Sequence, residues 1–428
     1  MGHLHSLNRP SQLTAAAWAA ACSLAFIVVY GGCTWLTLQR GDVGQWYWDW
    51  ELKIPFLPWM IVPYWSIDLL FVAAFFVCRT RQELTAHGRR VLLAIAVAGL
   101  GFLLLPLRAA FPRPDVTGMF GWMFGALRAF DAPHNLFPSL HIAFGVLLWT
   151  LYARRFSGWW VHPWFVLVTT STLFTWQHHI GDIAGGLVLA TFCFYAGRET
   201  AARLPVTPNY RVGGYYLAGA LACGVVATWW LLWPMMSLLL IAGAYCGLGP
   251  GVYRKENGVL PWSARLVLAP VLIGQRISLW FYQRQCRAWD EVVPGVLMGR
   301  VLRDTEAAAA NATAVLDLTA EFSEARSFRA ARYLNVPVLD LTEPTDKQLQ
   351  QAADFIREQT RQGRVYVHCK IGYSRSAAAV GAFILRAGHA ATSDQVVEQL
   401  RRARPSIVIR PEVSRVFARL AGNRTEET

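Results

Sequence analysis

The sequence predicts a multi-pass α-helical membrane domain followed by a small α/β domain, and three observations support this fold class. Hydrophobic residues make up 54% of the 428 residues and charged residues only 16%, too apolar a composition for a soluble protein of this size. The long apolar runs all lie within residues 1–290. Residues 291–428 instead alternate short apolar runs with amphipathic segments, as strands alternating with helices do.

The apolar runs predict eight membrane spans. They are residues 13–38, 58–78, 91–107, 138–152, 160–176, 180–197, 214–233 and 235–249. Placing the N-terminus in the cytoplasm puts most of the basic residues of this half on the cytoplasmic side. Eight spans then leave the C-terminal domain in the cytoplasm of a multi-pass integral membrane protein, of the kind found in the bacterial inner membrane. Residues 260–288 are basic and aromatic and are predicted to lie in the interface; if they spanned, the last domain would lie outside.

Four segments follow from this reading: 1–54 (a membrane helix and outer loop), 55–200 (a membrane domain), 201–290 (additional membrane helices and an interfacial linker) and 291–428 (the α/β domain). Residues 1–290 carry 21 basic and 11 acidic side chains, so the basic excess flanks the spans. We therefore expect the lipid bilayer as a partner and no nucleic acid. The sequence predicts neither a cofactor nor a metal site, and it does not indicate an oligomeric state.

The α/β domain is expected to contain an edge strand at 295–300, a buried strand at 314–318, and further strands at 336–339 and 364–368. Thr345 with Gln348 forms a capping-box pattern that opens a helix, and Thr392 with Gln395 opens another. Gly388 ends the helix between them. The loop after the strand at 364–368 should therefore lie at the carboxyl end of a central sheet.

That loop carries the strongest chemical signal of the chain. The strand ends in His368-Cys369, and Arg375 follows after five residues, at the start of a helix-like segment. A sharp turn from strand to helix points backbone N–H groups into one concavity and makes an anion cradle. These amides and Arg375 should stabilise a nucleophilic Cys369 thiolate, while Arg375 grips phosphate oxygens and Ser376 assists departure of the sulfur. The substrate-binding loop consists of Lys370, Ile371, Gly372, Tyr373 and Ser374.

His-Cys-x5-Arg-Ser resembles the signature of the cysteine-dependent phosphatases, in their dual-specificity branch. The resemblance implies an α/β cysteine-phosphatase domain and a general acid on a loop before the cysteine. Asp340, 29 residues upstream and directly after an apolar strand, fits this role, with Glu343 in reserve. Val-Leu-Asp-Leu-Thr with His-Cys-Lys is most similar to lipid-directed members, including mitochondrial phosphatidylglycerophosphate phosphatases.

Polar residues at the outer ends of spans three to six predict a second site, because ionisable groups that converge in a membrane protein are usually functional. His178 and Asp182 are four residues apart, so the carboxylate would orient an imidazole that attacks phosphorus. Arg113 and Ser139 would bind phosphoryl oxygens, and His141 would protonate the leaving alkoxide.

Arg-Pro, Pro-Ser-x-His and His-x3-Asp resemble the type 2 phosphatidic acid phosphatase superfamily over residues 55–200, particularly its sphingomyelin-synthase-like and inositol-phosphotransferase-like branch. The resemblance implies a six-helix phosphatidic acid phosphatase-like core plus extra helices. Two cations that the family often has are replaced here, by Pro106 and Thr172. The site would then bind a phosphodiester, use Arg108 instead, or be inactive.

Together these features predict a bifunctional membrane phosphatase and phosphotransferase of phospholipid metabolism, whose substrate is a phospholipid or another phosphorylated molecule. One alternative is a membrane-anchored protein phosphatase acting on phosphotyrosine or phosphoserine. In another, the membrane half is a lipid-binding or flipping module without catalysis. A deep pocket with aromatic walls would favour a phosphotyrosine substrate, and an open, basic pocket would favour a lipid.

Overall fold

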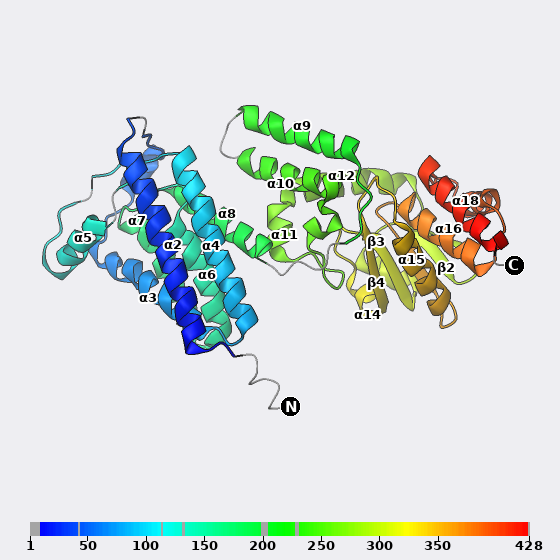
Figure 1. Cartoon of the computed structure of the whole chain (residues 1–428), viewed down its shortest axis with the longest axis horizontal. Coiled ribbons are helices and arrows are strands. Elements are labelled where there is room, and N and C mark those ends of the chain that lie inside the picture. The colour runs from blue at the N-terminus through cyan, green and yellow to red at the C-terminus, as the bar shows by residue number, and fades with distance from the viewer. Residues whose placement is uncertain are drawn as a thin grey trace. The chain divides into compact units, whose positions relative to one another are not determined.

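The chain forms two compact units, residues 1–199 and residues 200–428. The structure, a computed structural model, describes residues 9–41, 43–112, 114–130, 133–197, 204–226 and 231–426. The first unit is helical, and the second combines helices with a five-stranded sheet (Figure 1). The second unit therefore includes the helices that precede the α/β domain.

Seven α-helices make up most of the described part of the first unit. They are α2 (Gln12–Leu38), α3 (Ile61–Val77), α4 (Arg81–Leu104), α5 (Gly118–Phe130), α6 (Leu140–Arg155), α7 (Val161–Phe174) and α8 (Ile180–Ala196). Short 3₁₀ turns η1 (Asp49–Lys53) and η2 (Pro58–Met60) lie between α2 and α3. Among the described residues, three stretches are long and apolar enough to cross a membrane, Gln12–Leu38, Pro58–Val77 and Arg81–Leu104, whereas α7 and α8 are shorter apolar helices. The helical N-terminal region is confirmed, and the full set of eight spans stays a prediction.

The third predicted span, residues 91–107, overlaps α4, a helix that begins ten residues before it. The Thr80 hydroxyl accepts a hydrogen bond from the Glu83 N–H and caps α4 there. Gly88 lets α4 pack closely on α2, because a Cβ at this position would lie 2.3 Å from the ring of Trp18. The first turns of α4 are rich in arginine and therefore lie outside the predicted span.

The second unit begins with the helices α9 (Tyr210–Val226), α10 (Leu232–Gly243), α11 (Trp262–Val267) and α12 (Ala269–Tyr282). A π-helical turn, η4 (Ala244–Leu248), and a 3₁₀ turn, η5 (Pro250–Tyr253), follow α10, and η6 (Gln283–Gln285) follows α12. Helices α9 and α10 pack against each other, and α12 packs against α10. The stretch expected to lie in the membrane interface corresponds to α11 and α12.

A mixed sheet in the order β1-β2-β5-β3-β4 forms the centre of the second unit. Its strands are β1 (Trp289–Val293), β2 (Val296–Gly299), β3 (Ala314–Thr319), β4 (Arg332–Val338) and β5 (Val365–His368). All neighbours run parallel except β1, which pairs antiparallel with β2. The expectation that residues 295–300 form an edge strand was wrong, because β1 lies outside them and begins before residue 291.

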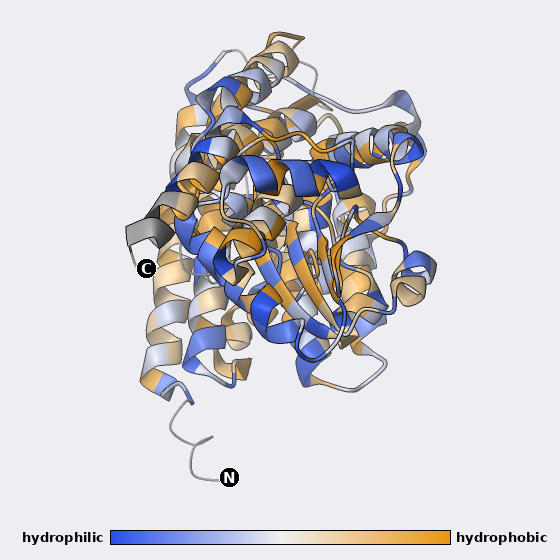
Figure 2. Cartoon of the chain, turned by 90° about the vertical axis from the view of Figure 1, so that its right-hand side faces the viewer, coloured by the Kyte–Doolittle hydropathy of each residue, from blue (hydrophilic) through white to orange (hydrophobic). Residues whose placement is uncertain are grey.

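Helices cover both faces of this sheet. They are α13 (Asp304–Ala310), α14 (Arg326–Ala330), α15 (Asp346–Gln359), α16 (Arg375–Ala387), α17 (Ser393–Ala403) and α18 (Pro411–Glu426). One face buries Leu316 and Val367 against Ile356 of α15 and Ile384 of α16. Apolar colour accordingly dominates the strands in Figure 2. Both predicted capping boxes and the left-handed Gly388 at the end of α16 are confirmed.

Candidate active site

The loop between β5 and α16 forms the predicted cradle, and glycine shapes it. Gly372 has φ +81°, a left-handed conformation that favours glycine. A Cβ at this position would lie 2.6 Å from the Gly299 carbonyl oxygen at the end of β2. The loop can therefore pass directly over the neighbouring strand only because residue 372 has no side chain.

Cys369 lies at the floor of the cradle and is only 4% exposed. Its Sγ is 3.4 Å from the Ser376 Oγ. Burial raises the pKa of the Cys369 thiol, but the Arg375 charge, the Ser376 hydroxyl and the backbone N–H groups of Ser376 and Gly372 outweigh it, so the pKa falls below its ordinary value. The geometry therefore favours a thiolate.

The Arg375 guanidinium pairs with Glu321, a buried carboxylate that was not predicted from the sequence. Its two terminal nitrogens donate to the two oxygens of Glu321 at 2.7 and 3.2 Å, and both side chains are only 2% exposed. The Val338 carbonyl accepts a further bond at 2.8 Å. This paired arrangement fixes the plane of the guanidinium beside Cys369. Only the position of Glu321 just after an apolar strand could have signalled it.

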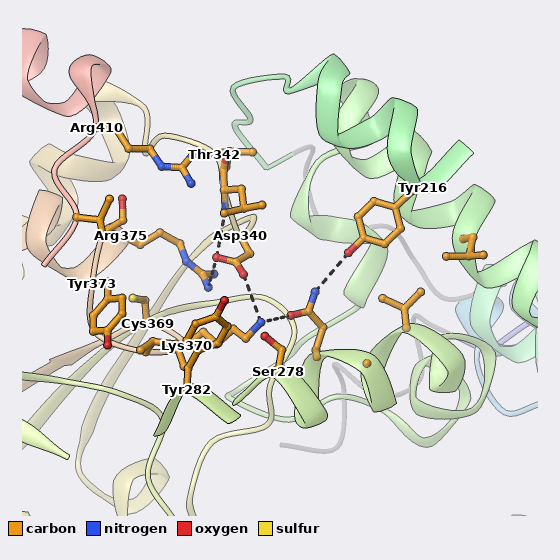
Figure 3. Close-up of a pocket in the computed structure, with 18 of the residues that line it drawn as sticks. Tyr216, Ser278, Tyr282, Asp340, Thr342, Cys369, Lys370, Tyr373, Arg375 and Arg410 are labelled. Atoms are coloured by element: carbon orange, nitrogen blue, oxygen red, sulfur yellow. Dashed lines mark hydrogen bonds and ion pairs between the residues drawn. The ribbon is translucent and has the colours of Figure 1, made fainter. Parts of the chain in front are cut away.

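Asp340 lies over the cradle, where the acid was predicted. Its carboxylate accepts from Arg375 at 3.2 Å and lies 3.5 Å from the Lys370 Nζ (Figure 3). Burial raises the pKa of this carboxyl, but the two cations outweigh it and hold the pKa below its usual range. Asp340 lines the pocket, whereas Glu343 is not among the described residues that do.

The pocket above Cys369 has a volume of about 830 Å³ and two different walls. One wall is the cradle with Asp340 and Arg410, and the other comes from α9, α10 and α12. The Lys370 Nζ donates to the Gln275 Oε1 at 2.7 Å, and the Gln275 Nε2 donates to the Tyr216 Oη at 3.4 Å. Apolar and aromatic side chains complete the lining: Pro234, Leu238, Pro270, Val271, Tyr282 and Tyr373. The helices before the α/β domain therefore take part in its pocket.

A buried group of charged side chains surrounds His368, the residue before Cys369. The His368 Nε2 lies 2.6 Å from a Glu324 oxygen, and Lys255 pairs with Asp317. Burial lowers the pKa of His368, but Glu324 and Asp317 outweigh it and raise the pKa to about 9, so the imidazole is cationic. Two carboxylates thus face two cations. Asp317, Glu324 and His368 have a spacing that would suit a metal ion, but Lys255 and His368 already neutralise the carboxylates.

The first unit brings part of the second predicted site together. His141 and His178 line one cavity of about 220 Å³, together with Asp68 and Asn135. The Asp182 carboxylate lies 3.6 Å from the His178 Nδ1. Asp68, a carboxylate in the same cavity, was not predicted. Its position within the apolar helix α3 could have indicated a functional residue.

Two predicted members of this second site have other positions. The Ser139 hydroxyl is buried and caps α6 by accepting from the Ile142 N–H at 3.3 Å, and Ser139 is not among the described residues that line the cavity. Arg113 lies outside the described residues. The adjacent His179 faces Glu51 at 3.3 Å, a pairing that sequence reading did not anticipate.

Comparison with known proteins identifies the C-terminal region. Residues 300–418 match the family described as "Dual specificity phosphatase, catalytic domain". Over 123 residues the chain is 37% identical to dual specificity protein phosphatase 12 of Mus musculus. The aligned stretch covers 27% of this chain and 36% of that protein. The chain thus spans about a third of the length of this relative.

Solved structures of similar fold include Tk-PTP in its active form (24% identity, 32% of this chain, 97% of that chain, TM-score 0.30). Another is PTPMT1 in complex with PI(5)P (22% identity, 33% of this chain, 99% of that chain, TM-score 0.30). These matches indicate a dual-specificity phosphatase catalytic domain at residues 300–418 and support a phosphoric monoester hydrolase.

Proposed function

We propose that this protein removes a phosphomonoester from the headgroup of a membrane phospholipid, through a phosphoenzyme on Cys369. The observation that carries the proposal is the two-walled pocket. A thiolate and a fixed guanidinium lie on one side, and an apolar helical wall lies on the other. Phosphate and hydrocarbon parts of one substrate would each find a matching surface.

The first step transfers the phosphoryl group to sulfur. The Cys369 thiolate forms the S–P bond while the P–O bond to the lipid alcohol breaks, and Arg375 and the loop N–H groups hold the non-bridging oxygens. Asp340 donates its proton to the leaving oxygen. In the free protein the Asp340 carboxyl is ionised, because Arg375 and Lys370 lower its pKa. A bound phosphate dianion would pair with these two cations instead, which would raise the pKa of Asp340 and let the carboxyl carry this proton.

The second step returns the sulfur to its starting state. Asp340, now a carboxylate, takes a proton from water as the water oxygen attacks phosphorus. The S–P bond breaks and inorganic phosphate leaves. Sulfur departs as a thiolate, which the Ser376 hydroxyl at 3.4 Å stabilises with a hydrogen bond. Asp340 ends protonated, as the next turnover requires.

Exposed apolar side chains on two helices that contribute to the pocket support a lipid rather than a soluble substrate. Many large apolar side chains of α9 and α12 are exposed, among them Leu217, Leu221, Val225, Ile273, Ile277 and Trp280. Exposed apolar side chains in this number on two helices suit contact with a membrane. Tyr216, Tyr282 and Tyr373 give the pocket part of the aromatic lining expected for a phosphotyrosine substrate. Lys370 and Arg410 add the positive charge expected for an anionic lipid headgroup, and together with the exposed apolar helices they favour the lipid. A domain held at the bilayer by its own chain also meets lipid headgroups at high effective concentration.

For the first unit we propose hydrolysis or transfer of a lipid phosphoryl group through His178. The cavity that joins His178, His141 and Asp68 supports this second activity, as does Asp182 behind His178. An imidazole oriented by a carboxylate can attack phosphorus, and a second imidazole can protonate the leaving alkoxide.

The test is an assay of purified full-length protein on mixed micelles of phospholipids with and without a headgroup phosphomonoester, and on phosphopeptides. We expect release of phosphate from the lipid monoesters, lost in Cys369→Ser and retained in His178→Ala. Preference for phosphopeptides would instead support a membrane-anchored protein phosphatase. If His178→Ala leaves every activity on lipid phosphodiesters unchanged, the second site has no catalytic role.

A further inference from the structure

The loop that carries Asp340 has a backbone conformation that needs outside support. Leu341, the next residue, has φ +62°, a left-handed conformation that is unfavourable for a leucine. The Leu341 N–H donates to the Asp340 Oδ1 at 3.1 Å, so this conformation also orients the carboxylate. The position of the acid therefore depends on whatever holds these two peptide units.

Two side chains from the preceding helical segment hold them. The Tyr245 Oη donates to the Asp340 carbonyl oxygen at 2.8 Å, and the Asn209 Nδ2 donates to the Leu341 carbonyl oxygen at 2.8 Å. Arg410, from the phosphatase domain itself, adds a bond to the same Leu341 oxygen at 3.0 Å. The two consecutive carbonyls of the acid loop are thus both bound by residues outside the phosphatase family match.

Asn209 and Tyr245 are also hydrogen-bonded to each other and fixed by their surroundings. The Asn209 N–H donates to the Tyr245 carbonyl at 3.0 Å, and the Asn209 Oδ1 caps α9 by accepting from the Val212 N–H at 3.2 Å. Tyr245 is 2% exposed, and its ring stacks on that of Tyr216 with centroids 5.6 Å apart. Tyr245 lies in the π-helical turn η4, an irregularity that is frequent at functional sites.

We propose that Tyr245 and Asn209 are positioning residues for the general acid, so that the helices before the phosphatase domain are required for full protonation of the leaving group. The inference rests on the Cys369 chemistry of the proposed function and goes beyond it. Neither residue is among the described residues that line the pocket, so they act through Asp340. Their loss should therefore slow esters that need a proton on the leaving oxygen and spare esters that do not.

The experiment compares aryl phosphates, from phenyl phosphate to a difluorinated umbelliferyl phosphate whose leaving phenol is acidic enough to depart unprotonated. Full-length protein in detergent is used, with Tyr245→Phe, which keeps the ring stack, and Asn209→Asp, which keeps the cap acceptor. We expect Tyr245→Phe to lower kcat/KM for phenyl phosphate about fivefold to tenfold, the factor for one hydrogen bond. For the umbelliferyl ester the change should stay within about twofold. Tyr215→Phe, an exposed tyrosine on α9, is the matched control.

Combination with Asp340→Asn separates positioning from a structural role. If Tyr245 acts through the acid, Tyr245→Phe causes no further loss for phenyl phosphate once Asp340 is replaced. An equal fall on all esters, or no fall on any, overturns the inference. If Cys369→Ser hydrolyses these esters as fast as the unmodified protein, the proposed function itself fails and the inference fails with it. If Cys369→Ser is inactive but Tyr245→Phe shows none of the expected changes, only the inference fails.

Discussion

Replacing Glu321 with glutamine tests whether this buried carboxylate fixes the Arg375 guanidinium beside Cys369. In the structure each oxygen of Glu321 accepts from one terminal nitrogen of Arg375. Glutamine preserves the shape and one acceptor, but it turns an NH2 group toward the second guanidinium nitrogen. The substitution therefore removes one charge-assisted hydrogen bond, worth about 1.5–3 kcal/mol.

If Arg375 is needed in its present plane to hold the transferring phosphoryl group, most of that free energy is lost from the transition state. At about 1.4 kcal/mol per tenfold change in rate, kcat/KM for Glu321→Gln should fall roughly 10- to 150-fold. The assay is steady-state hydrolysis of an activated aryl phosphate, where protonation of the leaving group does not limit the rate. Glu398→Gln, which breaks an exposed pair with Arg402, is the control and should change kcat/KM little. A value for Glu321→Gln within twofold of the unmodified protein would refute the reasoning.

The remaining predictions concern the cradle and its support. Because the pKa of Cys369 is lowered, its alkylation by iodoacetamide should reach half its maximal rate at a pH below the pKa of an ordinary thiol, and Arg375→Ala should raise that midpoint. Because the folded-state pKa of His368 is raised to about 9, its contribution to stability should be complete below about pH 6.5 and vanish as pH rises through 9; thermal unfolding of the unmodified protein and His368→Gln across this range measures it. Gly372→Ala should nearly abolish phosphatase activity, because its Cβ would lie 2.6 Å from the Gly299 carbonyl; activity equal to that of the unmodified protein would contradict this clash.

The parts of the site that lie close together in the sequence could be predicted from it. Cys369, Arg375 and the loop between them form one strand-to-helix turn, so local chain geometry nearly determines their arrangement. Asp340 was predictable because it follows a strand whose end meets the same edge of the sheet. Its role stays a prediction, but it does lie within 3.2 Å of Arg375.

Residues that come from distant segments could not be predicted. Glu321 and Gln275 reach the site through tertiary packing; Glu321 follows an apolar strand, but no motif marks either residue. The edge strand β1 was missed because its sequence, Trp-Asp-Glu-Val-Val, is mixed and follows a basic, aromatic helix. Above all, apolar runs predicted spans at 214–233 and 235–249 and an interfacial segment at 260–288, but they did not indicate that α9–α12 belong to the same unit as the sheet. An apolar run shows that a segment avoids water, not which partner covers it.

In the proposed function, Cys369 carries the phosphoryl group of a lipid phosphomonoester during turnover. The most direct measurement is rapid acid-free quenching of full-length protein with such a lipid in micelles, followed by mass spectrometry of the peptide that contains Cys369. We predict an added phosphoryl group on this peptide during turnover of the unmodified protein and none in Cys369→Ser. Steady hydrolysis of the lipid by Cys369→Ser, or phosphate trapped on another residue, would contradict the account.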